Sequence, residues 1–349
     1  MKQQIVFTHK FEQSLSDSIA KCNPDKIFVL ADDTTIRMCY NRIKHFESLK
    51  KAQPITIPSA DVNKNLTSLS CVWTVLQAAK ATRYSMLINL GGGMVTDIGG
   101  FAAATFKRGI NFVNVPTTLL AMVDASVGGK TGINFGGLKN EIGAFAFPQT
   151  VIIDTQWLET LDHENLLSGY AEMLKHGLIT ERKLLPTLLN FDTATFNLHQ
   201  LSDMLKVSVA IKEQIVEQDP HEQGIRKALN FGHTFGHAFE EWAMTRHPIL
   251  HGYAVAYGMV CELYLSAIKQ GFPQTIMRQT VNFIRNNYGT LPITCDDYDA
   301  LISLMIHDKK NAGNNINFSL LHDLGSVVIN RTATEEEIKD ALDFLREGV

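Results

Sequence analysis

Two histidines four residues apart suggest a metal site. His233 and His237 occur in the segment LNFGHTFGH, and residues four apart on a helix share one face. His251 follows after Pro248, which provides the turn that could bring a second helix back to that face. Glu172 lies upstream, in GYAEMLKHG, on a segment whose apolar residues have a helical period. Two imidazoles and a carboxylate from separate helices are the donor set of a catalytic zinc site with a coordination position open to substrate.

Any one of these histidines alone is more simply explained as a satisfied core or surface residue. The group together favours the metal site, because flanking glycines let helices pack closely. Cations near the same segments suit a small substrate that carries both a carboxylate and a phosphate. Lys175 is expected to share the helical face of Glu172, and Arg226 that of His233. The other cations of this group are Lys212, Lys309 and Lys310.

A run of three glycines follows an apolar segment, residues 86–90, and precedes a helical one. Such a turn brings backbone N–H groups and a helix N-terminus against a pyrophosphate, although the spacing is not GxGxxG. Close packing of a helix on a sheet is the alternative. After the next apolar segment come two threonines that could cap a helix or bind a phosphate. The candidate dinucleotide contacts, with two aspartates that could accept ribose or amide hydrogen bonds, are Gly91, Gly92, Gly93, Asp97, Thr117, Thr118 and Asp124.

A second glycine-rich stretch, residues 127–140, carries Lys130, Lys139 and Asn140. It is not a Walker A loop, because that motif would need a glycine at the position of Ala125. Lysines among glycines indicate either an ordered anion contact or an exposed loop, and the residues leave both interpretations open.

The segments that must position these groups divide into two kinds. Short apolar runs alternate with helical segments in the first part, which predicts a parallel sheet with helices on its faces. The predicted strands are residues 27–30, 55–57, 86–90, 110–115 and 151–153, and the predicted helices between them include 66–79 and 94–106.

The second part is predicted to be helical. The predicted helices are residues 164–178, 201–218, 227–244, 254–270, 274–287 and 298–307. Residues 318–321 and 326–329 could form a small hairpin, and a last helix begins at Thr334 with a capping box to Glu337 and ends at Gly348. We therefore expect an α/β NAD-binding domain over residues 1–155 and a helical metal- and substrate-binding domain over 156–349, with the site in the cleft between them.

The composition narrows the class of protein. The chain has 349 residues, 45% of them apolar, and a net charge of −4 without a basic stripe, so we expect no nucleic-acid partner. Its five cysteines are scattered, which argues against a disulfide framework. No apolar run is long enough to span a bilayer, and the first ten residues lack the apolar core of a signal peptide. A soluble cytoplasmic protein without a membrane partner is expected.

Six stretches resemble the 3-dehydroquinate synthases of the shikimate pathway, which serves aromatic amino acid and chorismate biosynthesis. They are GGGMVTDIGGFAAATFKRG, VPTTLLAMVDASVGGKTGIN, LKNEIGAF, GYAEMLKHGLI, RKALNFGHTFGHAFE and HGYAVAYGM. The resemblance runs through most of the chain. It implies a Rossmann-like parallel-sheet domain followed by an all-helical C-terminal domain, with tightly held NAD, a divalent metal (zinc or cobalt) and a homodimer.

The resemblance also implies a role for each matching residue. The metal ligands are Glu172, His233 and His251, and His237 becomes a proton-handling group beside the metal. The NAD contacts are Asp61, Lys64, Gly91, Gly92, Gly93, Asp97, Thr117, Thr118, Asp124, Lys130, Lys139, Trp157, Leu158, Glu159 and Thr160. The substrate contacts are Asp124, Lys130, Asn140, Lys175, Lys212, Arg226, Asn230, His237, Lys309 and Lys310. Arg108, at the sheet end opposite the phosphate-binding turns, matches an arginine that reaches the neighbouring subunit's site.

The implied reaction converts 3-deoxy-D-arabino-heptulosonate 7-phosphate to 3-dehydroquinate and phosphate. In it NAD oxidises a ring hydroxyl, the acidified C–H allows β-elimination of phosphate, and the same NADH returns the hydride before ring opening and aldol closure. Two related activities are the alternatives: another sugar-phosphate cyclase, and a metal-dependent NAD alcohol or glycerol dehydrogenase, which needs no cluster of cations. A non-catalytic nucleotide or metal sensor would tolerate the loss of catalytic groups, and none is lost.

Overall fold

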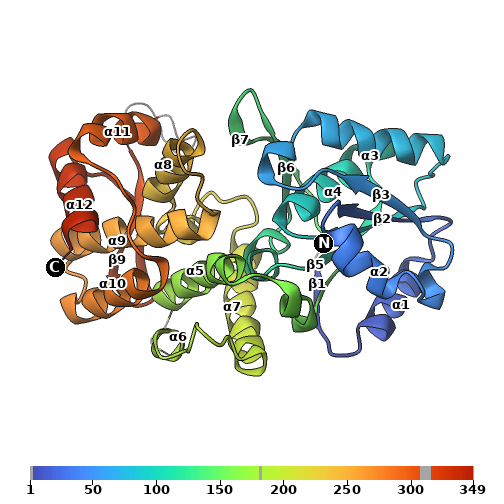
Figure 1. The fold of residues 1–349 in the computed structure, drawn as a ribbon, viewed down its shortest axis with the longest axis horizontal. Coiled ribbons are helices and arrows are strands. Elements are labelled where there is room, and N and C mark those ends of the chain that lie inside the picture. Colours follow the sequence, from blue (N-terminus) through green and yellow to red (C-terminus); the bar gives the residue numbers. More distant parts are fainter. Residues whose placement is uncertain (1–2, 181–182, 307–315, 349) are drawn as a thin grey trace. The chain divides into compact units, whose positions relative to one another are not determined.

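The computed structural model describes residues 3–180, 183–306 and 316–348 (Figure 1). The chain divides into two units, Met1–Asp162 and His163–Val349. Each unit has its own core, and each carries part of the predicted site.

A six-stranded parallel sheet forms the centre of the first unit. Its order is β1-β8-β5-β4-β2-β3. The strands are β1 (Gln4–Phe7), β2 (Ile27–Asp32), β3 (Gln53–Ile57), β4 (Met86–Gly91), β5 (Asn111–Pro116) and β8 (Thr150–Ile153). The predicted parallel sheet and its five predicted strands are confirmed, because buried parallel strands are apolar on both faces. The edge strand β1 was not predicted, since it has four residues and begins with an exposed glutamine.

Helices cover this sheet, and they are α1 (Phe11–Cys22), α2 (Asn41–Ile43), α3 (Leu66–Ala78) and α4 (Gly93–Thr105). The two predicted helices are confirmed as α3 and α4. The side chain of Asn65 caps α3 by accepting hydrogen bonds from the amides of Thr67 and Ser68 (3.0 and 3.1 Å). Helix α4 lies close against β4 because a Cβ on Gly99 would fall 1.9 Å from the side-chain oxygen of Asn89.

The glycine- and lysine-rich stretch forms an antiparallel hairpin of β6 (Lys130–Phe135) and β7 (Leu138–Phe145). Gly136 and Gly137 make its two-residue turn, with φ of 60° and 85°. The residues alone had indicated either an ordered anion contact or an exposed loop. A Gly-Gly pair between two β-rich runs is a signal for such a hairpin, and it could have been used.

The second unit is mostly helical. Its helices are α5 (His163–Ile179), α6 (Leu184–Leu189), α7 (Leu198–Gln218), α8 (His233–Met244), α9 (His251–Gln270), α10 (Gln274–Tyr288), α11 (Tyr298–Ile306) and α12 (Glu335–Glu347). Helix α9 is the central one, with α5, α8, α10 and α12 packed against it. The predicted hairpin is confirmed as β9 (Phe318–Asp323) and β10 (Ser326–Arg331), and Thr334 and Glu337 form the predicted capping box of α12.

One predicted helix is wrong. Residues 227–244 are not continuous: residues Ile225–Asn230 form a 3-10 helix (η7), and α8 begins only at His233. The break falls at Gly232, whose φ of 80° is left-handed and therefore cannot continue a right-handed helix. Arg226 therefore does not share a helical face with His233. The last residue of the predicted helix 298–307, His307, lies outside the described residues.

Among the described residues, we find no helix that is both long and apolar enough to cross a membrane.

Candidate active site

The glycine turn joins β4 to α4 at the carboxyl end of the sheet. Gly91 ends the strand, Gly92 is the N-cap of α4 and Gly93 begins the helix. A Cβ on Gly92 would lie 3.2 Å from the side chain of Thr118, and one on Gly93 would lie 3.1 Å from Ala125. The glycines thus bring the N-terminus of α4 close to the neighbouring loop, where exposed N–H groups suit a phosphate.

The two threonines lie beside this turn, at the end of the adjacent strand β5. Gly91 and Pro116 are register partners, and the amide of Thr117 donates to the Gly91 carbonyl oxygen (3.0 Å). The hydroxyl of Thr118 accepts from the amide of Ala121 (3.1 Å), so it caps the following helical turn, one of the two predicted roles. The carboxyl ends of two neighbouring parallel strands therefore meet in one corner beside the N-terminus of α4.

Three predicted residues from distant segments meet near α4. The buried ammonium of Lys64 pairs with the carboxylate of Asp97 and also donates to the side-chain oxygen of Asn140. Burial raises the pKa of Asp97 above its usual value, although the Lys64 charge opposes this shift. Asn140 has a left-handed φ of 51° in β7. The hairpin thus places a polar side chain against the helix that follows the glycine turn.

A second contact ties the hairpin to the same region. Lys139 pairs with the carboxylate of Asp61 at 3.2 Å, and Asn134 donates to the same carboxylate at 3.2 Å. Lys130 is exposed at the start of β6, and Asp124 is partly buried in the short helical turn before the hairpin. Asp61, Lys64, Asp97, Lys139 and Asn140 form one polar cluster in the first unit.

The predicted cofactor turn after β8 is a 3-10 helix, Thr155–Thr160. The side chains of Trp157 and Leu158 are buried, with the Trp157 ring edge-on to Phe11 at 5.1 Å between centroids. Glu159 and Thr160 are exposed. Within residues 157–160, a ligand can reach backbone groups and the side chains of Glu159 and Thr160.

Arg108 lies between α4 and β5, at the end of the sheet opposite the glycine turn, as the order of the elements predicts. It follows Lys107 and precedes Gly109, and the three have left-handed φ values of 49°, 64° and 115°. Two non-glycine residues in this conformation cost about 1–2 kcal/mol each. The turn therefore holds Arg108 in a strained backbone conformation.

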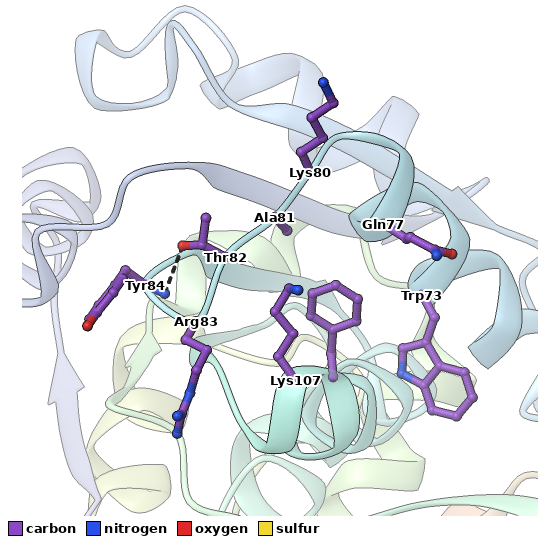
Figure 2. Close-up of a pocket in the computed structure, with 9 residues that line it drawn as sticks. Trp73, Gln77, Lys80, Ala81, Thr82, Arg83, Tyr84 and Lys107 are labelled. Atoms are coloured by element: carbon purple, nitrogen blue, oxygen red, sulfur yellow. Dashed lines mark hydrogen bonds between the residues drawn. The ribbon is translucent and has the colours of Figure 1, made fainter.

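A surface groove of about 780 Å³ lies next to this turn and is bounded by Lys80, Arg83, Lys107 and the ring of Trp73 (Figure 2). None of the predicted site residues that the structure describes lines it. The groove is therefore separate from these residues.

Three side chains converge in the second unit. The Oε1 atom of Glu172 lies 3.4 Å from Nε2 of His233 and 3.6 Å from Nε2 of His251. One donor atom from each residue lies within 4.8 Å of the other two. The three residues come from α5, α8 and α9, and the four-residue spacing places His237 beside them, with its ring 5.4 Å from that of His233. His237 is not part of the three-donor group.

This donor set fits a divalent cation such as zinc or cobalt. It offers two imidazole nitrogens and one carboxylate oxygen, which leaves room for a substrate oxygen. The second ring nitrogen of each histidine is also held: Nδ1 of His233 donates to the Phe231 carbonyl (3.1 Å), and Nδ1 of His251 donates to Glu240 (3.2 Å). Such outer contacts fix the tautomer that presents Nε2 to a metal.

The acidity of His251 reflects its neighbours. Burial acts to lower the pKa of His251, but the carboxylates of Glu240 and Glu172 outweigh it and raise the pKa to about 10. A metal binds the neutral imidazole, so metal binding must displace this proton.

Buried cations accompany the donors. Lys175 is 1% exposed and pairs with Glu172, as their predicted common face requires. Lys212 on α7 and Arg226 on η7 are also buried, and Arg226 donates to the Pro220 carbonyl oxygen at 2.6 Å. Asn230 donates to Glu222 at 2.8 Å. The predicted residues Lys309 and Lys310 lie outside the described residues.

Two buried glutamates near the histidines were not predicted. Glu240 contacts His251, and Glu262, which is fully buried on α9, accepts hydrogen bonds from the amides of Gly232 (2.7 Å) and Thr234 (3.1 Å). Glu262 thereby caps α8, whose own N-cap residue Gly232 has no side chain. Glu240 could have been found from its spacing of seven from His233, whereas the contact of Glu262 depends on tertiary structure.

Solved structures share this fold. A 2-epi-5-epi-valiolone synthase from Streptomyces hygroscopicus, solved with NAD+ and Zn2+, has a TM-score of 0.87 at 23% identity, over 99% of this chain and 97% of that one. A 2-deoxy-scyllo-inosose synthase complexed with carbaglucose-6-phosphate, NAD+ and Co2+ has a TM-score of 0.85 at 23% identity, over 99% and 96%. A sulfoacetaldehyde reductase from Bifidobacterium kashiwanohense, in complex with NAD+, has a TM-score of 0.72 at 13% identity, over 99% and 98%. The fold class is thus the dehydroquinate synthase-like one, which synthases share with a reductase.

Sequence comparison is more specific. The family model described as 3-dehydroquinate synthase N-terminal matches residues 54–168, and the one described as 3-dehydroquinate synthase C-terminal matches residues 169–311. A 3-dehydroquinate synthase from Parabacteroides distasonis is 51% identical over 348 residues, 99% of each chain. One from Streptococcus pyogenes is 34% identical over 346 residues, 98% of this chain and 96% of the relative. The chain belongs to the 3-dehydroquinate synthase family, as the six stretches predicted.

Proposed function

We propose that this protein converts 3-deoxy-D-arabino-heptulosonate 7-phosphate to 3-dehydroquinate and phosphate. The observation that carries the proposal is the group of Glu172, His233 and His251, one donor from each of three helices, next to the buried Lys175. A metal site combined with buried cations suits a hydroxylated substrate with two anionic groups. The family membership supports the same reaction.

The first unit is proposed to bind NAD. Its phosphate corner consists of the glycine turn and Thr117, and its polar cluster offers carboxylate, ammonium and amide groups for the remainder of the dinucleotide. The relatives in fold whose structures contain NAD+ are consistent with this role. NAD would supply a hydride acceptor, and a divalent cation on the second unit would supply a Lewis acid.

The residues of the second unit are proposed to bind and orient the substrate and to transfer protons. Lys212 and Arg226 are buried cations suited to the substrate's carboxylate or phosphate, and Asn230 supplies an amide. Lys175, which is buried beside Glu172, is suited to hold an anionic oxygen of the substrate close to the metal ligands. His237 is partly buried beside His233 and can pass a proton between substrate and water. Much of the catalysis is orientation of one small molecule.

A metal-dependent alcohol dehydrogenase is the second candidate, because a butanol dehydrogenase from Thermotoga maritima shares the fold with a TM-score of 0.69 at 15% identity. A dehydrogenase of small alcohols has no need of three buried cations. The buried Lys175, Lys212 and Arg226 therefore favour the phosphorylated sugar acid.

The direct test measures phosphate release from the heptulosonate phosphate with metal present and NAD far below the substrate concentration. We expect many turnovers per NAD and no net reduced nicotinamide. One NADH per turnover would instead identify a dehydrogenase, and release from sugar phosphates without a carboxylate would identify another cyclase. Lys212→Gln should reduce turnover, whereas Lys206→Gln, an exposed lysine on the same helix, should leave it unchanged.

The metal ligands are tested by metal content. Glu172→Gln, His233→Ala and His251→Ala should each lose bound metal and activity together. His199→Ala, which removes an exposed histidine from α7, is the control and should keep both. Full metal occupancy in one of the three variants would remove that residue from the ligand set.

We also propose a homodimer in which Arg108 of each subunit completes the phosphate site of the other. Its left-handed turn, at the end of the sheet opposite its own glycine turn, supports this role. Arg108→Ala and Lys130→Ala should each be inactive, and mixing them with subunit exchange should restore up to about a quarter of wild-type activity, because half of the dimers then have one intact site. No recovery would leave Arg108 a structural residue.

The proposed location is the cytoplasm. The five cysteines are all unpaired, as expected in a reducing compartment. Cell fractionation with an antibody to the protein tests this, and recovery in a secreted fraction would contradict it.

A further inference from the structure

Glu240 lies on the same face of α8 as the histidines of the site. It follows His233 by seven positions and His237 by three, and it is 8% exposed. Its Oε2 atom accepts a hydrogen bond from Nδ1 of His251 at 3.2 Å. A carboxylate this deeply buried costs free energy unless a partner offsets it.

His251 needs an external restraint because of where it lies. It is the first residue of α9, after the loop that follows α8, and its side chain is 27% exposed. Its neighbour in sequence at the N-cap is Leu250, which offers no polar group. The ring orientation of His251 therefore depends on what its Nδ1–H contacts.

The two histidines of the site are held by different acceptors. His233 donates to a neutral backbone carbonyl of its own segment, Phe231, whereas His251 donates to the carboxylate of a different helix. A carboxylate acceptor fixes the Nδ1–H tautomer and makes Nε2 a more basic ligand than a carbonyl acceptor does. Its charge also adds to the attraction for a divalent cation.

We propose that Glu240 is a positioning residue that orients His251 toward the metal and strengthens metal binding without touching the metal itself. The proposal rests on the metal site of the proposed function. Glu240 links α8 to the start of α9, so it also fixes the separation between the helices that carry His233 and His251.

The test is the affinity of the apo-protein for Co2+ and Zn2+, measured by competition with a chromophoric chelator, together with the visible spectrum of the Co2+ form. Glu240→Gln should weaken binding about 10–100-fold and alter the Co2+ spectrum. The control is Glu241→Gln, which changes the adjacent exposed residue and should leave both unchanged. Thermal unfolding of the metal-free proteins shows whether each variant folds.

Glu240→Asp separates orientation from charge and provides a second variant if the first does not fold. It keeps the carboxylate but withdraws it from Nδ1 of His251, so positioning predicts weakened binding again. Wild-type metal affinity in either folded variant would overturn the proposal. A lower melting temperature of that variant would not change this conclusion. If wild type binds metal and the Glu240 variants bind it more weakly, but wild type makes no dehydroquinate, only the proposed function fails. If wild type binds no metal, both fail.

Discussion

The contact between α8 and α9 makes the metal site sensitive to a single added methyl group. Gly258, on α9, packs directly against the backbone of α8. A Cβ at Gly258 would lie 2.0 Å from the Gly232 carbonyl oxygen and 2.7 Å from the Gly236 amide nitrogen. Both obstructing atoms are backbone, so neither can rotate away. Gly258→Ala should therefore force the two helices apart.

The size of the effect follows from these distances. An ordinary contact begins near 3.4 Å, so the methyl group is 1.4 Å too close to the carbonyl oxygen. Overpacking typically costs about 1–3 kcal/mol, and two backbone collisions place this variant at about 3 kcal/mol or more. For a unit of the size of His163–Val349, that lowers the melting temperature by roughly 6–12 °C. Metal–ligand distances tolerate only about 0.2 Å, and His233 directly follows Gly232, so metal affinity should fall as well.

The assay combines thermal unfolding with metal analysis of the purified Gly258→Ala protein. Ile268→Ala is the control, because Ile268 lies on the same helix and is 50% exposed. It should change the melting temperature by no more than about 2 °C. A Gly258→Ala protein that melts within about 3 °C of wild type and holds a full complement of metal would refute the reasoning.

Two further predictions concern a buried and a partly buried carboxylate of the same unit. Glu262→Gln can keep only one of the hydrogen bonds from the amides of Gly232 and Thr234, because its amide group then faces the other donor. We expect the free energy of unfolding, measured with urea, to fall by about 2–4 kcal/mol. An unchanged midpoint would show that Glu262 does not cap α8. The hydrogen bond and charge of Lys269 lower the pKa of Glu337, so the pair stabilises the fold above the ordinary glutamate pKa and loses this contribution as the pH falls through the lower, folded value. Wild type should exceed Glu337→Gln by about 1 kcal/mol or less at pH 7, with the difference shrinking below pH ~4.5; a difference independent of pH would contradict the assignment.

Periodicity and local chemistry predicted most of the fold. The buried strands β2, β4 and β5 are continuous apolar runs, and such runs identify parallel strands because both faces are covered. The capping box at Thr334 marked the start of α12 to the residue. The helix break at Gly232 was missed, because a glycine within a helical pattern is tolerated often enough that its left-handed φ cannot be inferred from sequence.

The candidate site was predictable where its residues are neighbours on one helix. The spacing of Glu172 and Lys175, and that of His233 and His237, each produced the expected proximity. Contacts that join separate segments were beyond spacing arguments, and that of Lys64 with Asp97 is an example. Asp97 was a candidate from its place after the glycine turn and Lys64 from the family resemblance, but neither source predicted the contact between them.

The burial of charge in the second unit is better explained by chemistry than by stability. Glu172, Lys175, Lys212 and Arg226 are each at most 5% exposed in a unit whose remaining interior is largely apolar. Removing such ions from water costs several kcal/mol each, and replacing a buried ion pair by apolar residues of similar volume is often neutral or stabilising. A helix such as α5, whose other buried side chains are mostly apolar, would therefore pack at least as well without Glu172 and Lys175. Their retention is accounted for by a ligand that needs a fixed carboxylate and ammonium in a site where water does not screen them.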